Sequence, residues 1–117
     1  MDAAFDVHRQ IGPGLMESVY EAVLARKLSN AGLQVQRQAP VKITIDGMTF
    51  DEGFKADLLI NGMVIVELKS VEQLHRVHSK QLLTYLRLTG SRLGLLINFG
   101  EEYLKNGFKR IVNGLPE

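Results

Sequence analysis

The sequence predicts an α/β fold with a central mixed β-sheet flanked by helices, and two observations support this prediction. In the middle of the chain, short runs rich in Val, Ile and Leu alternate with turn residues, which is typical of strands joined by hairpins. A helical pattern that begins at Val71 or Leu74 and ends at Thr89 then precedes another apolar run, Arg92–Phe99. Because a helix between two strands forms a crossover, that last run is expected to pair in parallel with a neighbour.

The length and composition fit one globular domain over residues 1–117. A chain of 117 residues can bury one modest core, and its 45% apolar content excludes a disordered protein. The absence of cysteine excludes a disulfide scaffold, a thiolate zinc site and a cysteine nucleophile. A formal net charge of +1 does not by itself mark a nucleic-acid-binding protein. No apolar run is long enough to span a membrane and no signal-peptide pattern occurs, so we expect a cytoplasmic protein without a membrane partner.

The N-terminal part predicts two helices. Residues Asp2–Gln10 have an amphipathic pattern, which Gly and Pro interrupt at Ile11–Gly14. A second helix is expected from Leu15 to Ala31, with Gly32 as its stop. At 100° per residue, the apolar face of this helix also carries a carboxylate, and its members are Glu17, Tyr20, Leu24, Leu28 and Ala31, with Glu21 near the edge. That carboxylate either complements the helix dipole from the first turn or has a function on the core side.

A first hairpin is expected after these helices. Leu33–Ile45 has the composition of a strand, in which Pro40 indicates an edge, a bulge or a break. Asp46-Gly47 is a hairpin turn signal, and the return strand begins at Met48–Phe50. Asp51–Gly53 is then expected to form a bulge or a short loop.

The stretch Phe54–Lys69 predicts a second, central hairpin that turns at Asn61-Gly62. After Lys55 near its start, three charges interrupt its apolar pattern: Asp57 in the first strand, and Glu67 and Lys69 in the second. Burying charges without partners is costly, so a central hairpin that carries them is expected to use them. A carboxylate followed by Glu-x-Lys on the next strand is the layout of a metal-dependent phosphodiesterase site.

A single site requires the three charges to face the same side of the sheet. Glu67 and Lys69 do so because strand side chains alternate, whereas the face of Asp57 depends on the turn. A two-residue loop, Asn61-Gly62, would place Asp57 on the opposite face. We therefore predict a three-residue loop, Ile60–Gly62, with Gly62 left-handed, or a bulge with the same effect. The cross-strand pairs expected from that loop are Leu59 with Met63, Asp57 with Ile65, and Lys55 with Glu67.

The helix that follows the hairpin carries three stripes and ends at Gly90. The apolar stripe, which should pack on the sheet, is Leu82, Leu83 and Leu86. The basic arc beside it is Arg76, Lys80 and Arg87, and no acidic residue occurs between Glu72 and Glu101. The third stripe is His78, Gln81 and Tyr85. The basic arc is either a solvated face or, if it borders the carboxylates, a surface for the phosphate backbone of a nucleic acid.

The C-terminal part completes the predicted sheet. Arg92–Phe99 is almost continuously apolar, which predicts a central strand buried on both faces. Glu101–Gly107 is expected to be a loop or short helix, and Phe108–Val112 a short strand or a helical turn.

Asp57 and Glu67-Leu68-Lys69, in a helix–hairpin–helix–strand order, resemble the PD-(D/E)xK nuclease superfamily. Gly14–Tyr20 is similar to the signature of the GxxExxY family, small prokaryotic members of that superfamily. The other matching stretches are Gly12–Leu15, Ala56–Leu58, Val64–Lys69, Val77-His78, Gln81–Leu86 and Leu93–Phe99. Ala56 stands where the superfamily name has Pro, and this departure removes no ligand.

The resemblance implies a restriction-endonuclease-like core and a metal-dependent nuclease that hydrolyses DNA, in preference to RNA. Asp57 and Glu67 would bind Mg²⁺ or Mn²⁺, with the Leu68 carbonyl as a further ligand and Glu17 reaching the ion directly or through water. Lys69 would position the attacking water or help to deprotonate it. The residues expected around these groups are Gln81 at the site, Tyr20 in support of Glu17, and His78 and Tyr85 beyond them.

Two alternatives remain open from the sequence. The three hairpin charges can form a structural ion-pair cluster, and the chain can be a catalytically inactive nucleic-acid-binding or interaction module that retains the nuclease fold. A domain of this size usually needs help to grip a duplex, so the expected partners are a nucleic acid and either a second copy of the chain or an unknown protein.

Overall fold

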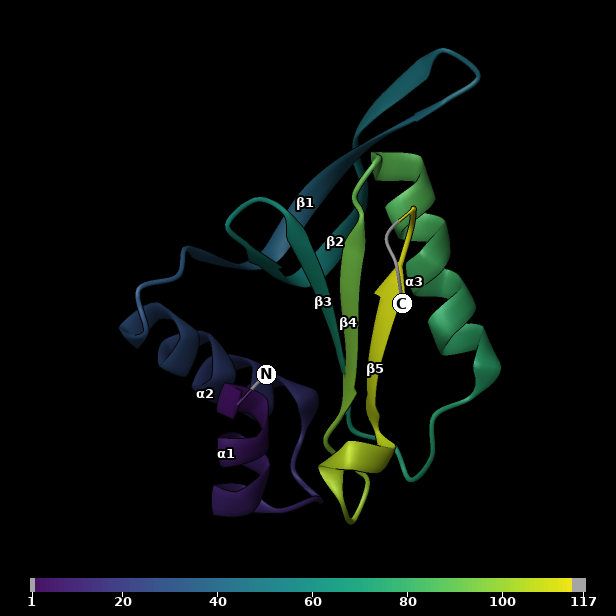
Figure 1. Cartoon of the computed structure of the whole chain (residues 1–117). Helices are drawn as coiled ribbons and strands as arrows, with labels where there is room; N and C mark the ends of the chain where they lie inside the picture. Colours follow the sequence, from purple (N-terminus) through teal and green to yellow (C-terminus); the bar gives the residue numbers. More distant parts are fainter. Residues whose placement is uncertain (1, 115–117) are drawn as a thin grey trace.

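The computed structural model describes residues 2–114 and has a five-stranded mixed sheet with helices on both faces (Figure 1). The elements in chain order are α1 (Asp2–Ile11), α2 (Glu17–Asn30), β1 (Val35–Ile45), β2 (Met48–Ile60), β3 (Val64–Lys69), α3 (Arg76–Thr89), β4 (Leu93–Asn98), a 3₁₀ helix η1 (Leu104–Asn106) and β5 (Phe108–Val112). The predicted α/β fold class is confirmed. No helix within residues 2–114 is long and apolar enough to cross a membrane.

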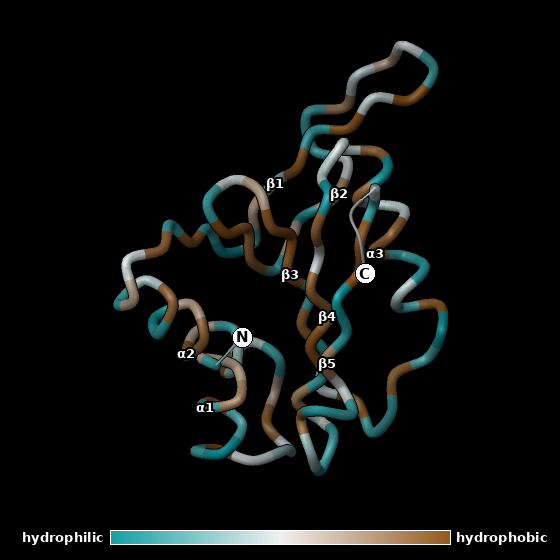
Figure 2. Tube along the Cα trace, viewed as in Figure 1, coloured by the Kyte–Doolittle hydropathy of each residue, from teal (hydrophilic) through white to brown (hydrophobic). Residues whose placement is uncertain are grey.

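The strands lie in the order β1-β2-β3-β4-β5, so sequence neighbours are also neighbours in the sheet. β1, β2 and β3 form antiparallel hairpins, and β5 pairs antiparallel with β4. β3 and β4 are parallel because α3 connects them, as the crossover pattern predicted. β4 lies between two strands and is largely buried, and Figure 2 shows the hydrophobic colour of the inner strands.

Two apolar cores lie on opposite faces of the sheet. α1 and α2 cover one face, where they contact Val66 and Leu68 of β3. α3 covers the other face through Leu82 and Leu86, which pack on Ile65 of β3. Because side chains alternate along a strand, Glu67 and Lys69 of β3 lie on the α3 face. The sheet therefore presents the predicted site on the side that α3 covers.

The helix ends agree with the predicted stop signals, but two helices start later than expected. α2 begins at Glu17 rather than Leu15, and α3 begins at Arg76, after a capping box formed by His75. Residues 70–75 form a loop because they pack closely against the end of β4. A Cβ on Gly100 would lie only 2.1 Å from the Val71 carbonyl oxygen. Gly90 ends α3 in the left-handed conformation, as predicted.

The first hairpin is longer than expected and extends beyond the body of the protein (Figure 1). β2 continues through the predicted loop at residues 51–53, where three residues lie opposite Lys42 in an expanded bulge. Gly53 permits this bulge because a Cβ there would lie 2.4 Å from the side chain of Ile43. Pro40 is on β1, which is an edge strand, as one of the predicted alternatives required. We call residues 42–53 the β arm.

The central turn has the predicted length but not the predicted position. Ile60 pairs with Val64, so the three-residue loop is Asn61–Met63, and the predicted pairs of Asp57 with Ile65 and Lys55 with Glu67 are wrong. Asn61 and Gly62 have φ of 53° and 67°, and the Met63 N–H donates to the Ile60 carbonyl oxygen at 3.0 Å. Asn and Gly tolerate this conformation, whereas Ile60 stays in the strand with its side chain buried. Continued one step beyond its last pair, Leu58 with Val66, the observed register aligns Asp57 with Glu67.

Candidate active site at the fork of β2 and β3

Asp57 lies where β2 and β3 separate. The last backbone pair between these strands is Leu58 with Val66, while β3 continues to pair with β4 as far as Lys69. Beyond that pair, the Asp57 side chain replaces a backbone acceptor of β2, since the Leu68 N–H donates to its Oδ2 at 2.8 Å. We call this opening the fork. It leaves the carboxyl groups of Asp57 and Glu67 together, joined by a side-chain hydrogen bond.

Glu67 is the most perturbed group of the fork. Its Oε1 is buried and has no hydrogen-bond partner among the described residues. Its pKa is raised from 4.5 to about 9, first by burial and then by the charge of Asp57 and the hydrogen bond between them, against the lowering effect of Lys69. At neutral pH Glu67 therefore keeps a proton unless a positive group enters the fork.

Glu17 lies in the first turn of α2 within electrostatic reach of the fork. Partial burial raises its pKa, Lys69 lowers it, and Asp57 and Glu21 raise it. Glu17 is an exposed residue at the start of α2, although its carboxyl group is partly buried on the side of the fork. The carboxylate that α2 does bury is Glu21, which is 6% exposed.

Glu21 and Gln38 are two site residues that sequence reasoning missed. Arg37 Nε donates to Glu21 Oε2 at 3.0 Å, and Gln38 Nε2 donates to Glu21 Oε1 at 2.6 Å. The same Gln38 nitrogen lies 3.2 Å from Asp57 Oδ1, so it links the buried carboxylate of α2 to the fork. Gln38 has a φ of 48°, which no pattern in the sequence indicates. The spacing of Glu17 and Glu21, four residues apart on one helix, was a signal that could have found Glu21.

Tyr20 supports the turn that leads into α2. Its ring is buried and stacks on Phe99 at a centroid distance of 4.5 Å. Its hydroxyl donates to the Gly12 carbonyl oxygen at 2.6 Å and accepts from the Leu15 N–H at 3.1 Å. Tyr20 thus holds the segment before Glu17 rather than the Glu17 side chain itself.

A Tyr20→Phe variant is expected to lose about 1–2 kcal/mol of unfolding free energy, because two hydrogen bonds disappear while the ring stacking remains. Urea denaturation followed by circular dichroism measures this loss. Tyr103→Phe is the matched control, since Tyr103 is exposed and should give no change. Equal stability of Tyr20→Phe and the wild type would contradict a supporting role for the hydroxyl.

One flank of α3 faces the fork. Burial raises the pKa of Tyr85, and the charges of Glu67 and Asp57 raise it further. Its ring stacks on Phe54 of β2 at 3.8 Å. On the same flank, partial burial lowers the pKa of His78, as does the charge of Lys69. His78 Nδ1 accepts a hydrogen bond from a backbone N–H at the start of α3, and exposed Gln81 lies on this flank between the two.

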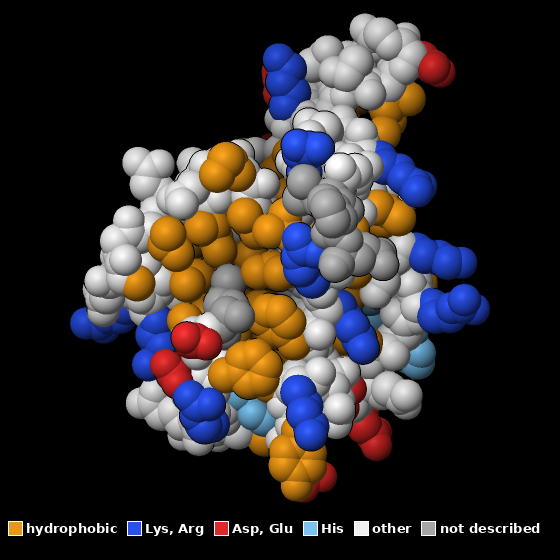
Figure 3. Space-filling view, in the orientation of Figure 1, with side chains coloured by type: hydrophobic (Ala, Val, Ile, Leu, Met, Phe, Trp, Pro, Cys, Tyr) orange, Lys and Arg blue, Asp and Glu red, His pale blue; other side chains and the backbone are white. Residues whose placement is uncertain are grey.

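The structure does not bring the basic arc to the carboxylates. Arg76, Lys80 and Arg87 are exposed, and at 100° per residue they lie roughly 150° around α3 from the flank that faces the fork. They turn toward the β5 side, where Figure 3 shows Lys and Arg side chains along the outer edge of α3. Their contact with a phosphate backbone stays a prediction, and it concerns a surface separated from the fork by the width of the helix.

The donor set of the fork fits a hard cation. Within residues 2–114, no group of three or more His, Asp or Glu side chains is arranged to hold a metal ion. The fork itself offers two carboxyl groups that share a hydrogen bond, and a buried Glu67 oxygen without a partner. Carboxylate oxygens are ligands that Mg²⁺ and Mn²⁺ prefer, with water or backbone carbonyls completing the shell.

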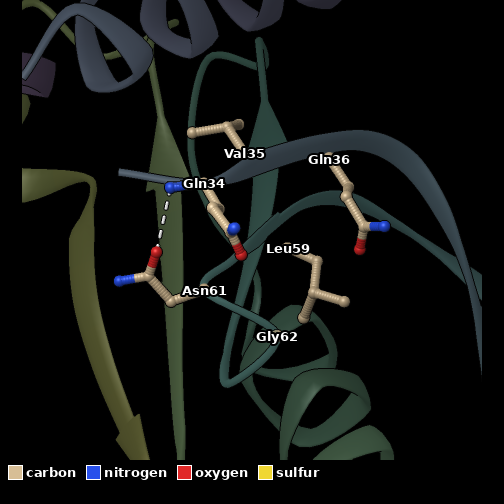
Figure 4. Close-up of a pocket in the computed structure, with 6 residues that line it drawn as sticks. All are labelled: Gln34, Val35, Gln36, Leu59, Asn61 and Gly62. Atoms are coloured by element: carbon tan, nitrogen blue, oxygen red, sulfur yellow. Dashed lines mark hydrogen bonds between the residues drawn. The ribbon is translucent and has the colours of Figure 1, made fainter. Parts of the chain in front are cut away.

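A separate hollow of about 590 Å³ lies beside the central turn (Figure 4). Its lining residues are Gln34, Val35, Gln36, Leu59, Asn61 and Gly62. Asn61 Oδ1 accepts a hydrogen bond from the Gln34 N–H at 2.9 Å, which closes one side of the hollow. None of these residues was predicted for the site, although Leu59 lies on the same face of β2 as Asp57.

The comparisons with known proteins agree with this geometry. A family model of the PD-(D/E)XK nuclease superfamily matches residues 1–111, a span that includes the fork, both flanking helices and the strand parallel to β3. A search of curated proteins found no match. The narrower resemblance to the GxxExxY family stays a prediction. The chain belongs to the PD-(D/E)XK nuclease superfamily.

Proposed function

We propose that this protein is a metal-dependent nuclease that hydrolyses phosphodiester bonds of DNA. The observation that carries the proposal is that the carboxyl groups of Asp57 and Glu67 lie next to each other at the fork. One Glu67 oxygen is buried there without a hydrogen-bond partner among the described residues. A structural ion-pair cluster would satisfy its buried atoms with its own cation. Lys69 is close enough to lower the pKa of Glu67, but it forms no ion pair with the fork carboxylates among residues 2–114.

Asp57, Glu67 and the Leu68 carbonyl would hold a Mg²⁺ or Mn²⁺ ion, and Glu17 would reach it through water. The bound ion would supply Lewis acidity and lower the pKa of a coordinated water. The chain's own part is to keep the ligands in place. Asp57 is held by the Leu68 N–H through one oxygen and by Gln38 through the other, so its carboxylate cannot rotate freely.

Lys69 would act on the substrate and on the attacking water. It lies on the same face of β3 as Glu67, two residues closer to the C-terminal end of the strand. Its backbone is fixed because its carbonyl oxygen accepts from the Phe99 N–H at 2.9 Å. From this position its ammonium would orient the water and offset the charge of the phosphate, while Gln81, His78 and Tyr85 would line the α3 side of the fork.

The test is cleavage of supercoiled plasmid and of DNA and RNA oligonucleotides in Mg²⁺, in Mn²⁺ and in EDTA. The wild type is expected to cut DNA only with a divalent ion. Asp57→Ala, Glu67→Ala and Lys69→Ala are each expected to lower the rate at least about 100-fold, because even residues that merely orient metal ligands contribute about 10- to 100-fold. Glu102→Ala and Lys105→Ala, at exposed positions outside the fork, are the matched controls.

Cleavage in EDTA, or fork variants as active as the controls, would refute the mechanism. A wild type that binds DNA without cutting it under any metal condition would favour the alternative, a binding module that retains the nuclease fold. Circular dichroism of each variant separates a loss of chemistry from a loss of folding.

A further inference from the structure

An apolar row crosses the whole sheet on the face that α1 and α2 only partly cover. Each member pairs with the next across adjacent strands, and the row is Val35, Ile60, Val64, Leu93 and Val112. Four of the five are only half-buried, the exception being Ile60. Figure 3 shows apolar side chains gathered on this face beside the N-terminal helices. We call these five residues the open row.

The open row continues into a hollow at the end of the sheet. This hollow measures about 400 Å³ and is lined by residues 62–64 and 89–93, which include Val64 and Leu93 of the row. Met63, another of its lining residues, is 65% exposed. A contiguous, partly exposed apolar surface rimmed by polar residues is typical of an interaction site.

The β arm carries a second apolar surface. Ile43 pairs with Phe50 and Ile45 with Met48, so the four side chains lie on one face of the two-stranded arm. Ile45, Met48 and Phe50 are 40%, 58% and 44% exposed. A two-stranded hairpin without a covering layer is only marginally stable in water, so this face calls for a partner. The arm points away from the body of its own chain and does not reach the open row (Figure 1).

The charges of the two surfaces are complementary. The β arm has one lysine and three acidic residues, which are Asp46, Asp51 and Glu52, and Glu52 is ion-paired with Lys55 of β2 at 3.4 Å. The open row is bordered by basic residues, because Arg92 lines the same hollow as Leu93, and Arg110 lies on the same sheet face as Val112, two residues before it. Complementary charges around an apolar centre favour a specific orientation of two surfaces.

We propose that the β arm of one copy of this chain docks on the open row of a second copy, and that the exchange is reciprocal in a two-fold symmetric dimer. Because the β arm and the open row are different surfaces, their contact closes into a dimer only if it is exchanged reciprocally across a two-fold axis, which makes the combined interface isologous. A stable interface buries about 800 Å² on each partner. One arm offers a small surface, and reciprocal exchange doubles it. This inference does not depend on the proposed nuclease activity.

The absence of cysteine from the chain permits a direct test by disulfide cross-linking. Phe50→Cys and Met63→Cys proteins are prepared separately, and each is oxidised alone and in a mixture. Arm exchange is expected to give a disulfide-linked dimer at least about tenfold faster in the mixture than in either protein alone. Faster linkage of Phe50→Cys alone would indicate contact between arms, faster linkage of Met63→Cys alone would indicate contact between rows, and either result would overturn the proposal.

The oligomeric state gives an independent readout through light scattering after size exclusion at tens of micromolar protein. The wild type is expected to be a dimer, and Phe50→Lys and Met48→Lys to be monomers. Val77→Lys, on α3 and 63% exposed, is the matched control and should remain dimeric. A monomeric wild type, or a dimer that survives both arm substitutions, would also overturn the proposal.

Discussion

A Glu67→Gln variant is expected to lose DNA cleavage and to become more stable than the wild type in the absence of metal. Folding raises the pKa of Glu67 from 4.5 to about 9, so its contribution to stability is complete below pH 4.5 and is lost as the pH rises toward 9. Glutamine stays neutral over this range and can donate to Asp57 as the protonated Glu67 does. The difference in unfolding free energy between the variant and the wild type should therefore increase with pH and reach a few kcal/mol near pH 8.

Urea denaturation in EDTA at pH 5 and pH 8 measures this difference. The variant and the wild type should nearly coincide at pH 5 and separate at pH 8. Glu102→Gln is the control, because an exposed carboxyl should give no pH-dependent difference. The prediction fails if the two proteins keep the same difference at both pH values. Added Mg²⁺ should reduce the difference at pH 8, since a cation in the fork favours the charged form of Glu67.

Asn98→Ala is expected to cost roughly 2–4 kcal/mol of unfolding free energy. The Asn98 side chain is fully buried at the end of β4. Its Oδ1 accepts from the N–H groups of Val71 and Gly100 at 3.0 and 3.1 Å, and its Nδ2 donates to the Val71 carbonyl oxygen at 2.9 Å. We call these three hydrogen bonds the Asn98 clamp. Alanine leaves these backbone groups without their partner, and since they are only partly buried, together they cost less than the sum of the about 1–3 kcal/mol that each would cost if fully buried.

Urea denaturation at neutral pH tests this prediction with two comparison variants. Asn98→Asp keeps the acceptor for both N–H groups but loses the donor, so its stability should fall between those of Asn98→Ala and the wild type. Asn113→Ala removes an amide that bonds to Ser91 from a less buried position and should cost less than Asn98→Ala. Equal losses of unfolding free energy for Asn98→Ala and Asn113→Ala would contradict the larger contribution assigned to the Asn98 clamp.

The parts of the fold that the sequence predicts are those set by local patterns. The parallel pairing of β3 and β4 follows from the crossover, and the end of α3 follows from Gly90. The position of the central turn was missed by one residue, because the preference of Asn61-Gly62 for left-handed backbone competes with the burial of Ile60. The prediction that Asp57 and Glu67 share a face survived this error, since a shift by two residues of pairing preserves the face.

The parts of the site that could not be predicted depend on contacts between distant segments. Gln38 reaches Asp57 only because its own backbone has a positive φ and because α2 places Glu21 beside it. Neither condition produces a periodic pattern of residues from which it could be predicted. The start of α3 at Arg76 likewise depends on the Asn98 clamp, which holds Val71 in a loop although the sequence there is compatible with a helix.

The position of β3 in the sheet has a consequence for the order in which the protein folds. Its antiparallel neighbour is three residues away along the chain, whereas its parallel neighbour follows only after the 23 residues that include α3. Short loops close at little entropic cost, so the hairpin that aligns Asp57 with Glu67 can form early. The slow step is then the arrival of β4, which brings the Asn98 clamp and fixes the backbone of Lys69. During synthesis, a chain that has emerged only as far as α3 would hold both carboxylates but no finished site.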